Sequence, residues 1–209
     1  MVAERTYPHP VTAPLEPPPQ PAAVPSAFAP LRAEVELGRT VAARPDLVLH
    51  DVPAPTRLAP YAVAVAAQVL RDGEETASGR FVVLHDPQGQ EGWHGCTRVV
   101  AFVSADVEAE MAADGALAEV GWQWLTEALT ERGARHTAAA GTVTRTTSSR
   151  FGQLTDPSED SEVEVRASWT ALADADGRHD LDRHLQAWCD LLCSTAGLPP
   201  PGVSTLRPR

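Results

Sequence analysis

The chain has 209 residues, of which 43% are hydrophobic and 22% are charged, a balance typical of a folded globular protein rather than a disordered one. Its 17 basic and 28 acidic residues give a formal net charge of −11, which disfavours binding to nucleic-acid phosphates and to anionic lipid surfaces. The sequence contains no Lys, Ile or Asn. This bias against residues with AT-rich codons indicates a bacterial genome of high GC content.

No segment of the sequence is expected to enter a membrane. No run approaches the roughly 18 to 20 consecutive apolar residues that a spanning helix needs, and the N-terminus lacks the charged and apolar regions of a signal peptide. Three cysteines cannot all pair within one chain, which favours reduced thiols. We therefore expect a cytoplasmic protein that binds neither nucleic acid nor membranes.

The N-terminal segment is rich in proline, with eight prolines in residues 1–25. Proline lacks the amide donor that a helix or a central strand requires, so we expect residues 1–25 to form a disordered, polyproline-like tail. This tail is either a passive extension or a docking peptide for a proline-binding partner. Residues 26–206 are long enough to form a single domain with its own core.

The first half of this domain predicts one helix followed by strands. The helix begins near Ser26, a favourable N-cap, and ends before Pro45. An Asp72-Gly73 turn signal between two apolar runs predicts a hairpin. The strands expected in this half are a short edge strand at 46–52 and further strands at 61–70, 80–85 and 96–105.

The second half predicts a helix, two strands and a final helix. Apolar residues at spacings of three and four indicate a helix from Asp114 to Gly133. Segments 141–151 and 162–172 are expected strands, and the second alternates apolar and polar residues as a half-buried strand does. The last helix begins near Asp180 and ends at Gly197.

This order of elements predicts an α+β fold. Short connections between consecutive strands favour antiparallel neighbours. We expect an antiparallel sheet of five to six strands covered by about three helices, in the order α-β-β-β-α-β-β-α.

Two cysteines of the last helix, Cys189 and Cys193, raise the question of a metal or redox site. Both lie on the apolar stripe of that helix, and His184 sits roughly 140° around the helix from Cys189. A metal would need further ligands from elsewhere. Core packing is the favoured interpretation, because free cysteine is among the most buried residue types, and we expect no metal site.

The loop "LHDPQGQEGWHGCTR" gathers the densest set of polar side chains. A His-carboxylate pair in this loop is able to act as a general base or to bind a metal or small molecule. The alternative is an ordinary turn, because Asp-Pro and Gly are common turn residues. The candidate binding residues of this loop are His85, Asp86, Trp93, His94 and Arg98.

Trp122 lies just off the apolar stripe of its helix, where an exposed aromatic side chain acts as an anchor for a partner. Core packing of the same ring is the alternative. The sequence contains no phosphate-binding loop, GxSxG elbow, HExxH or dinucleotide fingerprint. We therefore expect no cofactor, and the catalytic residues are unknown.

Several phrases of the sequence resemble one family. "VLHDPQG", "GWQWLTEAL", "VRASWT" and "WCDLLCSTAGLPPPGV" resemble the actinobacterial proteins grouped as domain of unknown function 3000, with the resemblance spanning about residues 27–206. The family name carries no activity. The order of elements is also similar to that of type III secretion chaperones, which is an analogy of fold alone.

These observations favour a non-enzymatic binding or chaperone-like module that recognises a protein partner or a second copy of itself. A well-patterned core without a convergent catalytic motif supports this interpretation. The alternative is a small-molecule-binding protein or enzyme that uses the loop from His85 to Arg98.

Overall fold

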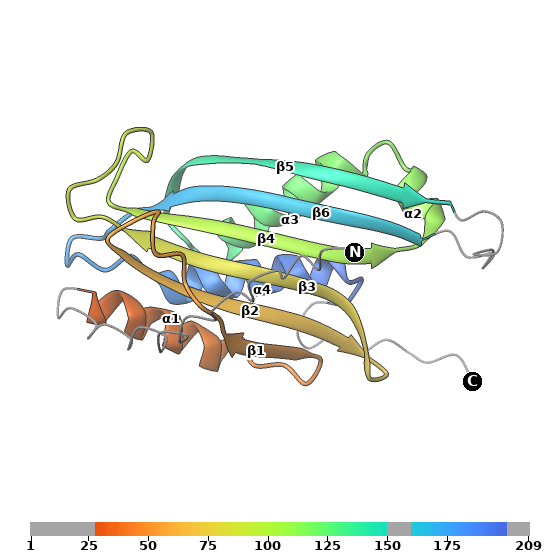
Figure 1. Ribbon diagram of the computed structural model, residues 1–209, viewed down its shortest axis with the longest axis horizontal. Helices are drawn as coiled ribbons and strands as arrows, with labels where there is room; N and C mark the ends of the chain where they lie inside the picture. Colours follow the sequence, from red (N-terminus) through yellow and green to blue (C-terminus); the bar gives the residue numbers. More distant parts are fainter. Residues whose placement is uncertain (1–27, 150–159, 200–209) are drawn as a thin grey trace, which may run out of the picture.

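The computed structural model describes residues 28–149 and 160–199, which form a six-stranded antiparallel sheet with helices on one face (Figure 1). The strand order across the sheet is β1-β2-β3-β4-β6-β5. The predicted α+β fold is confirmed. The elements are α1 (Ala29–Val41), β1 (Leu47–Asp51), β2 (Tyr61–Arg71), β3 (Glu74–His85), β4 (Thr97–Val107), α2 (Ala109–Ala113), α3 (Leu117–Glu131), β5 (His136–Ser148), β6 (Asp160–Ala171) and α4 (Leu181–Thr195).

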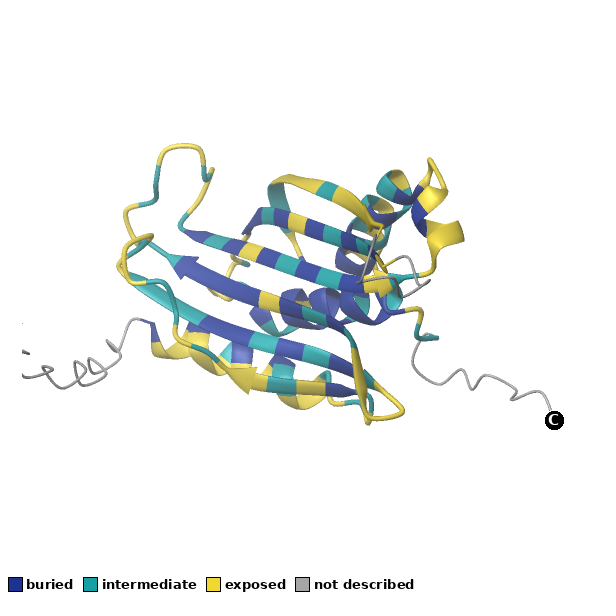
Figure 2. Cartoon of the chain, turned by 45° about the vertical axis from the view of Figure 1, so that its right-hand side comes forward, coloured by how far each residue is buried: buried dark blue, intermediate teal, exposed yellow. Residues whose placement is uncertain are grey.

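Helix α4 occupies the centre of the helical layer. It lies against β3 and β4 in the middle of the sheet and contacts α1 on one side and α3 on the other. Its apolar stripe is buried, and so are several residues beside that stripe (Figure 2). Helix α4 thus joins α1 and α3 to the middle of the sheet, while α3 and α2 also contact β5 directly.

The strands follow the period of two that the sequence predicts. In β6, Val163, Val165, Ala167 and Trp169 are buried towards the helices, while the residues between them face the opposite side. The hairpin of β2 and β3 turns at Asp72-Gly73, both with positive φ, which suits the two-residue turns of twisted hairpins.

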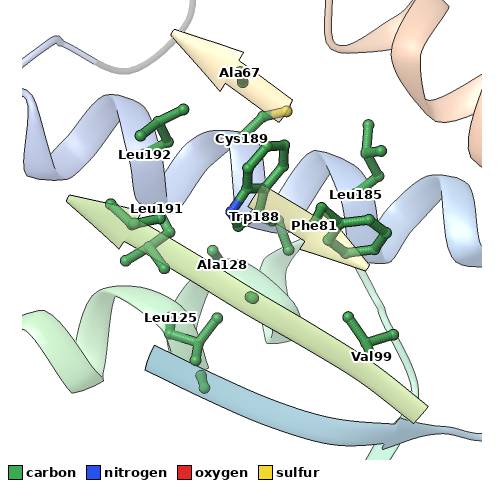
Figure 3. Close-up of a cluster of buried hydrophobic side chains, with 14 of the residues drawn as sticks. Ala67, Phe81, Val99, Leu125, Ala128, Leu185, Trp188, Cys189, Leu191 and Leu192 are labelled. Carbon is green, nitrogen blue, oxygen red and sulfur yellow. The ribbon is translucent and has the colours of Figure 1, made fainter. Parts of the chain in front are cut away.

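The core centres on Trp188 of α4 (Figure 3). Its ring packs on Phe81 with ring centroids 5.6 Å apart, and its Nε1–H donates to the carbonyl oxygen of Phe102 at 3.1 Å. Gly79 makes room for the indole, because a Cβ at this position would lie 2.9 Å from Cζ2 of Trp188. The indole of Trp188 therefore fills the space that a side chain at position 79 of β3 would need.

The face of the sheet opposite the helices is only partly covered. The chain between β1 and β2 passes over β2 and β3, where Val52, Ala54 and Ala59 pack on a small cluster formed by Ala64, Val82 and Leu84. Trp93 joins this cluster from the β3–β4 loop. In the part of the chain that the structure describes, no helix or strand covers the remaining part, over β4, β6 and β5, and we call it the open face.

The structure moves several predicted boundaries. The helix expected from Asp114 is preceded by the separate short helix α2, and α3 itself begins at Leu117. Strand β5 begins at His136, five residues before its predicted start, because a bulge between Thr137 and Ala140 breaks the alternation there. The predicted N-cap Ser26 and the proline-rich tail lie outside the described residues, as do the last residues of the strand predicted at 141–151.

The cysteines of α4 belong to the core, as predicted. Cys189 and Cys193 are each 3% exposed, and all three cysteines of the chain are free. Burial raises the pKa of Cys189 well above its ordinary value and that of Cys193 to about 11. Within the described residues, no group of three or more His, Cys, Asp or Glu side chains is arranged to hold a metal ion.

Among the described residues, none of the helices combines the length and the apolar character needed to cross a membrane.

Thiol labelling of the native protein should distinguish the three cysteines. Cys96 is half exposed, whereas both α4 thiols are buried and protonated. We expect an alkylating reagent to modify Cys96 at least about tenfold faster than Cys189 or Cys193, which should react only on unfolding. Mass spectrometry of timed digests measures these rates. Comparable native rates at Cys189 and Cys96 would contradict the buried position of the α4 thiols.

A methyl group at Gly79 should destabilise the fold. Its Cβ would lie 2.7 Å from the carbonyl oxygen of Phe102 and would displace Trp188. We expect Gly79→Ala to lower the free energy of unfolding by about 1–3 kcal/mol, measured by urea denaturation. Gly115→Ala is the matched control, because nothing lies within 4 Å of its Cβ, and it should change stability by less than about 0.5 kcal/mol.

Candidate functional site

His85 ends β3 and lies on the helical side of the sheet. Its ring stacks with the rings of Phe28 and Tyr61 and makes an edge contact with the ring of His179. The Nδ1 atom of His85 lies 2.9 Å from the hydroxyl oxygen of Thr97. Burial lowers the pKa of His85, and the carboxylate of Asp86 partly opposes this effect. His85 is therefore a neutral member of an aromatic cluster.

Arg98 lies on the other side of the sheet. In the β3–β4 ladder, His85 pairs with Thr97 and Leu84 pairs with Arg98, so the side chains of His85 and Arg98 point in opposite directions. Arg98 donates to the carbonyl oxygen of Ala138 at 3.0 Å and to the hydroxyl groups of Thr170 and Ser168 at 3.1 and 2.6 Å. It joins β4 to β6 and holds the bulge of β5.

The other residues of this loop shape the turn. One carboxylate oxygen of Asp86 accepts the backbone N–H of Gln88 at 3.0 Å, and the other accepts the side-chain amide of Gln90 at 3.3 Å. Trp93 packs over the small cluster opposite the helices. His94 is exposed and has a positive φ of 59°.

These five side chains do not meet in one cavity. They are divided between the two sides of the sheet and the solvent, and the larger hollows of the described residues are lined by other side chains. The arrangement provides no shared cavity for the small-molecule hypothesis. The hydrogen bonds of Asp86 and Arg98 are instead those of a turn and of a strand-to-strand link.

A buried histidine lies behind this end of the sheet. His184 of α4 is fully buried, and its Nδ1 accepts the indole N–H of Trp169 at 2.9 Å. Its Nε2 has no partner with hydrogen-bond geometry in the described residues. Burial lowers the pKa of His184 to about 3, with His136 and His179 acting in the same direction and the Arg135 carbonyl opposing. The imidazole is a neutral acceptor of the core.

A hollow of about 370 Å³ lies between the end of α1, α3 and α4. Its two arginines are already bound within the fold. Arg132 forms two parallel hydrogen bonds to Asp190, at 2.6 and 2.8 Å, and Arg44 donates to the carbonyl oxygen of Pro199 at 3.2 Å. Cys193 lines the hollow, but a thiol with a raised pKa is a poor nucleophile.

The outer edge of β5 is the most accessible backbone of the sheet. None of its 13 residues is buried, and β6 is the only strand of the described residues that pairs with it. In Figure 2, β5 is largely exposed, while in β6 and β4 buried residues alternate mainly with intermediate ones. Gly141, Val143 and Arg145 face the helices, and the residues between them face the open side.

Two hollows flank the middle of β5. On the helical side, a hollow of about 460 Å³ is lined by Ala118, Glu119, Trp122, Gln123, Gly141 and Val143. On the open face, a shallow hollow of about 570 Å³ is lined by Val100, Ala101, Phe102, Ala140, Gly141, Thr142, Arg166, Ala167 and Ser168. Apolar side chains are thus accessible on both sides of one unpaired strand edge. We call this surface the β5 edge site.

Trp122 is the one predicted site residue that lies at the β5 edge site. Its half-exposed ring packs beside Gly141, where a Cβ would lie 2.7 Å from Cζ3 of the ring. Trp122 contacts the core and also lines the hollow, and its role as an anchor for a partner stays a prediction. The exposed edge itself was not predicted, because the sequence pattern identifies strands but not their neighbours.

The neutral state of His184 predicts a pH dependence of stability. The unfolded imidazole takes up a proton near pH 6.5, whereas the folded one resists protonation until about pH 3. Its contribution is therefore complete above pH 6.5 and falls by up to about 1.4 kcal/mol per pH unit as the pH drops. His184→Asn retains an acceptor for Trp169 but does not titrate, so its urea-denaturation stability should depend less on pH. Parallel pH profiles of variant and wild type would contradict this role.

Comparison with known proteins identifies the family of the chain. Residues 24–204 match the family described as protein of unknown function (DUF3000), which confirms the resemblance carried by the sequence phrases. No curated protein and no solved structure matches the chain significantly, so the similarity to type III secretion chaperones stays a prediction. The match covers most of the chain, and the protein belongs to the DUF3000 family.

Proposed function

We propose that this protein is a non-enzymatic, chaperone-like binding module of the cytoplasm, which holds an extended segment of a protein partner as an added strand on β5. The observation that carries the proposal is the outer edge of the 13-residue strand β5, with which no other strand of residues 28–149 and 160–199 pairs. Such an edge presents a row of N–H and C=O groups that another chain can pair with.

The two edges of the sheet differ in their protection. Strand β1 has only five residues, and Leu47 is buried. Short edge strands, bulges and inward-pointing charges are the usual protections against pairing. In β5, two of these protections lie on either side of residues 140–144. One is the bulge between Thr137 and Ala140. The other is Arg145, whose charged side chain points inward and donates to the carbonyl oxygens of Ala112 and Asp114. Residues 140–144 contain neither a charge nor a proline.

The polar groups and thiols also favour this function. Arg98 and His184 are engaged in hydrogen bonds inside the fold, and Asp86 fixes a turn. These contacts are sufficient to explain side chains that otherwise suggest catalysis. Three free cysteines agree with a reducing compartment.

Peptides selected from a random display library by binding to the full chain provide the test. We expect them to protect the backbone amides of residues 140–144 from hydrogen exchange, because an added strand bonds groups that water otherwise reaches. Thr142→Lys should weaken their binding by about tenfold or more, since a charged edge discourages pairing. Fluorescence polarisation measures the affinities.

The matched control is Val48→Lys on β1. Val48 is 41% exposed and, like Thr142, faces away from the helices on an edge strand. This variant should bind the selected peptides as the wild type does. Protection that is confined to β1 or to the helices, or equal loss of binding in both variants, would show that β5 is not the binding edge.

A further inference from the structure

Building on this proposed function, we propose that the added strand belongs to a basic partner and runs antiparallel to β5. It carries a basic residue followed three and four positions later by two large apolar residues. The type of each partner residue follows from the side chains that line the hollows beside Val143, Thr142 and Thr146 of β5.

The helical side selects a large apolar side chain. Residues directly opposite each other in an antiparallel ladder project to the same face. A partner residue opposite Val143 therefore points towards the hollow beside Trp122. Gly141 contributes no side chain to this hollow, which leaves the ring of Trp122 accessible to an aromatic or branched apolar group.

The open face selects a second apolar side chain. A partner residue opposite Thr142 projects to the β5 rim of the shallow hollow, which Ala140 and Thr142 line. Both residues are exposed, and the side chain of Ala140 is a diagonal neighbour of that partner residue. Covering their methyl groups removes apolar surface from water, and a charged partner residue at this position would not.

The end of β5 selects a basic side chain. A hollow of about 460 Å³ next to Thr146 contains carboxylates from the ends of two strands, β4 and β6. Asp106 is exposed, and Glu162 is half-buried and accepts the hydroxyl proton of Ser104. A basic residue opposite Thr146 projects towards Glu162, which pairs with Thr146 in the ladder of β5 and β6. The net charge of −11 favours approach of a basic partner over the whole surface. The lining residues are Asp106, Val107, Thr146, Ser148, Asp160, Ser161 and Glu162.

The direction of the partner sets the order of these residues. Every paired strand in the sheet is antiparallel to its neighbour, and antiparallel pairs are slightly more stable per residue than parallel ones. A partner antiparallel to β5 passes Thr146 first. It reaches Val143 three residues later and Thr142 four residues later, which gives the spacing of the proposed motif.

A second copy of this chain fits the edge less well. Antiparallel pairing of two β5 strands centred on Val143 would place Ala140 opposite Thr146, so no cation would meet the acidic hollow. Two chains that each carry a formal charge of −11 also repel one another. These charges favour a different, basic protein as the occupant.

The test uses fluorescein-labelled peptides and the full chain. The probe has the sequence Ser-Arg-Thr-Thr-Phe-Val-Thr-Ser, and its comparison peptides have the reversed order, Glu in place of Arg, or Ser in place of Phe and Val. We expect the probe to bind at least about tenfold more tightly than each comparison peptide. Its binding should weaken as salt is added and should protect the amides of residues 140–144.

Protein variants identify the two selecting surfaces. Glu162→Gln should reduce the preference for Arg over Glu, whereas Glu91→Gln, on the β3–β4 loop, should leave it unchanged. Ala118→Leu should fill the hollow beside Trp122 and weaken the binding of the Phe-containing probe. This substitution removes no core side chain, and thermal unfolding checks that the variant is folded. An unchanged preference in Glu162→Gln would overturn the proposed basic residue.

The remaining outcomes separate this inference from the proposed function. If library-selected peptides protect β5 but the probe binds no better than its reversed form, the motif is wrong and strand addition still holds. If selected peptides protect other elements, both proposals fail. A dimer seen by light scattering, with β5 amides protected at increasing protein concentration, would identify a second copy as the occupant and overturn the basic partner.

Discussion

The packing of α4 on the middle of the sheet is the interaction on which the rest of the structure depends. Trp188 fills the space that Gly79 leaves, and its N–H bonds the backbone of β4. Because α1 and α3 both pack on α4, this helix attaches them to the middle of the sheet, and α3 and α2 add direct contacts at β5. Helices α1 and α4 also approach closely at Gly38 of α1, where a Cβ would lie 2.8 Å from Cα of Asp182 in α4.

The helices cover only one face of the sheet, and loop segments cover part of the opposite face. The segment between β1 and β2 and the β3–β4 loop cover the part over β2 and β3. Strand β5 lies beyond both, and on its helical side it meets only α3 and the short α2. The accessible edge and its flanking hollows are therefore consequences of the strand order, which places β5 at one edge of the sheet (Figure 1).

Several polar side chains that resemble catalytic groups instead form hydrogen bonds that join separate strands and helices of the fold. Arg98 bonds β6 and the β5 bulge, and His184 accepts the indole N–H of Trp169 in the core. Glu34 of α1 accepts the N–H of Leu181 at 2.9 Å and caps α4, whose own N-cap residue Asp180 provides no side-chain bond. Burial raises the pKa of Glu34, and the bonded N–H partly opposes this. Each contact joins residues far apart in the sequence.

The sequence by itself determined the type of most elements, the turn at Asp72-Gly73 and the buried place of the α4 cysteines. These features follow from local periodicity and from residue preference, which a short window of sequence contains. Only the tertiary structure decided that β6 lies between β4 and β5, that His85 and Arg98 face opposite sides, and that Trp122 borders an unpaired edge. Strand order and register depend on contacts between distant segments, and the alternation of apolar residues along one strand is the same whichever neighbour it has.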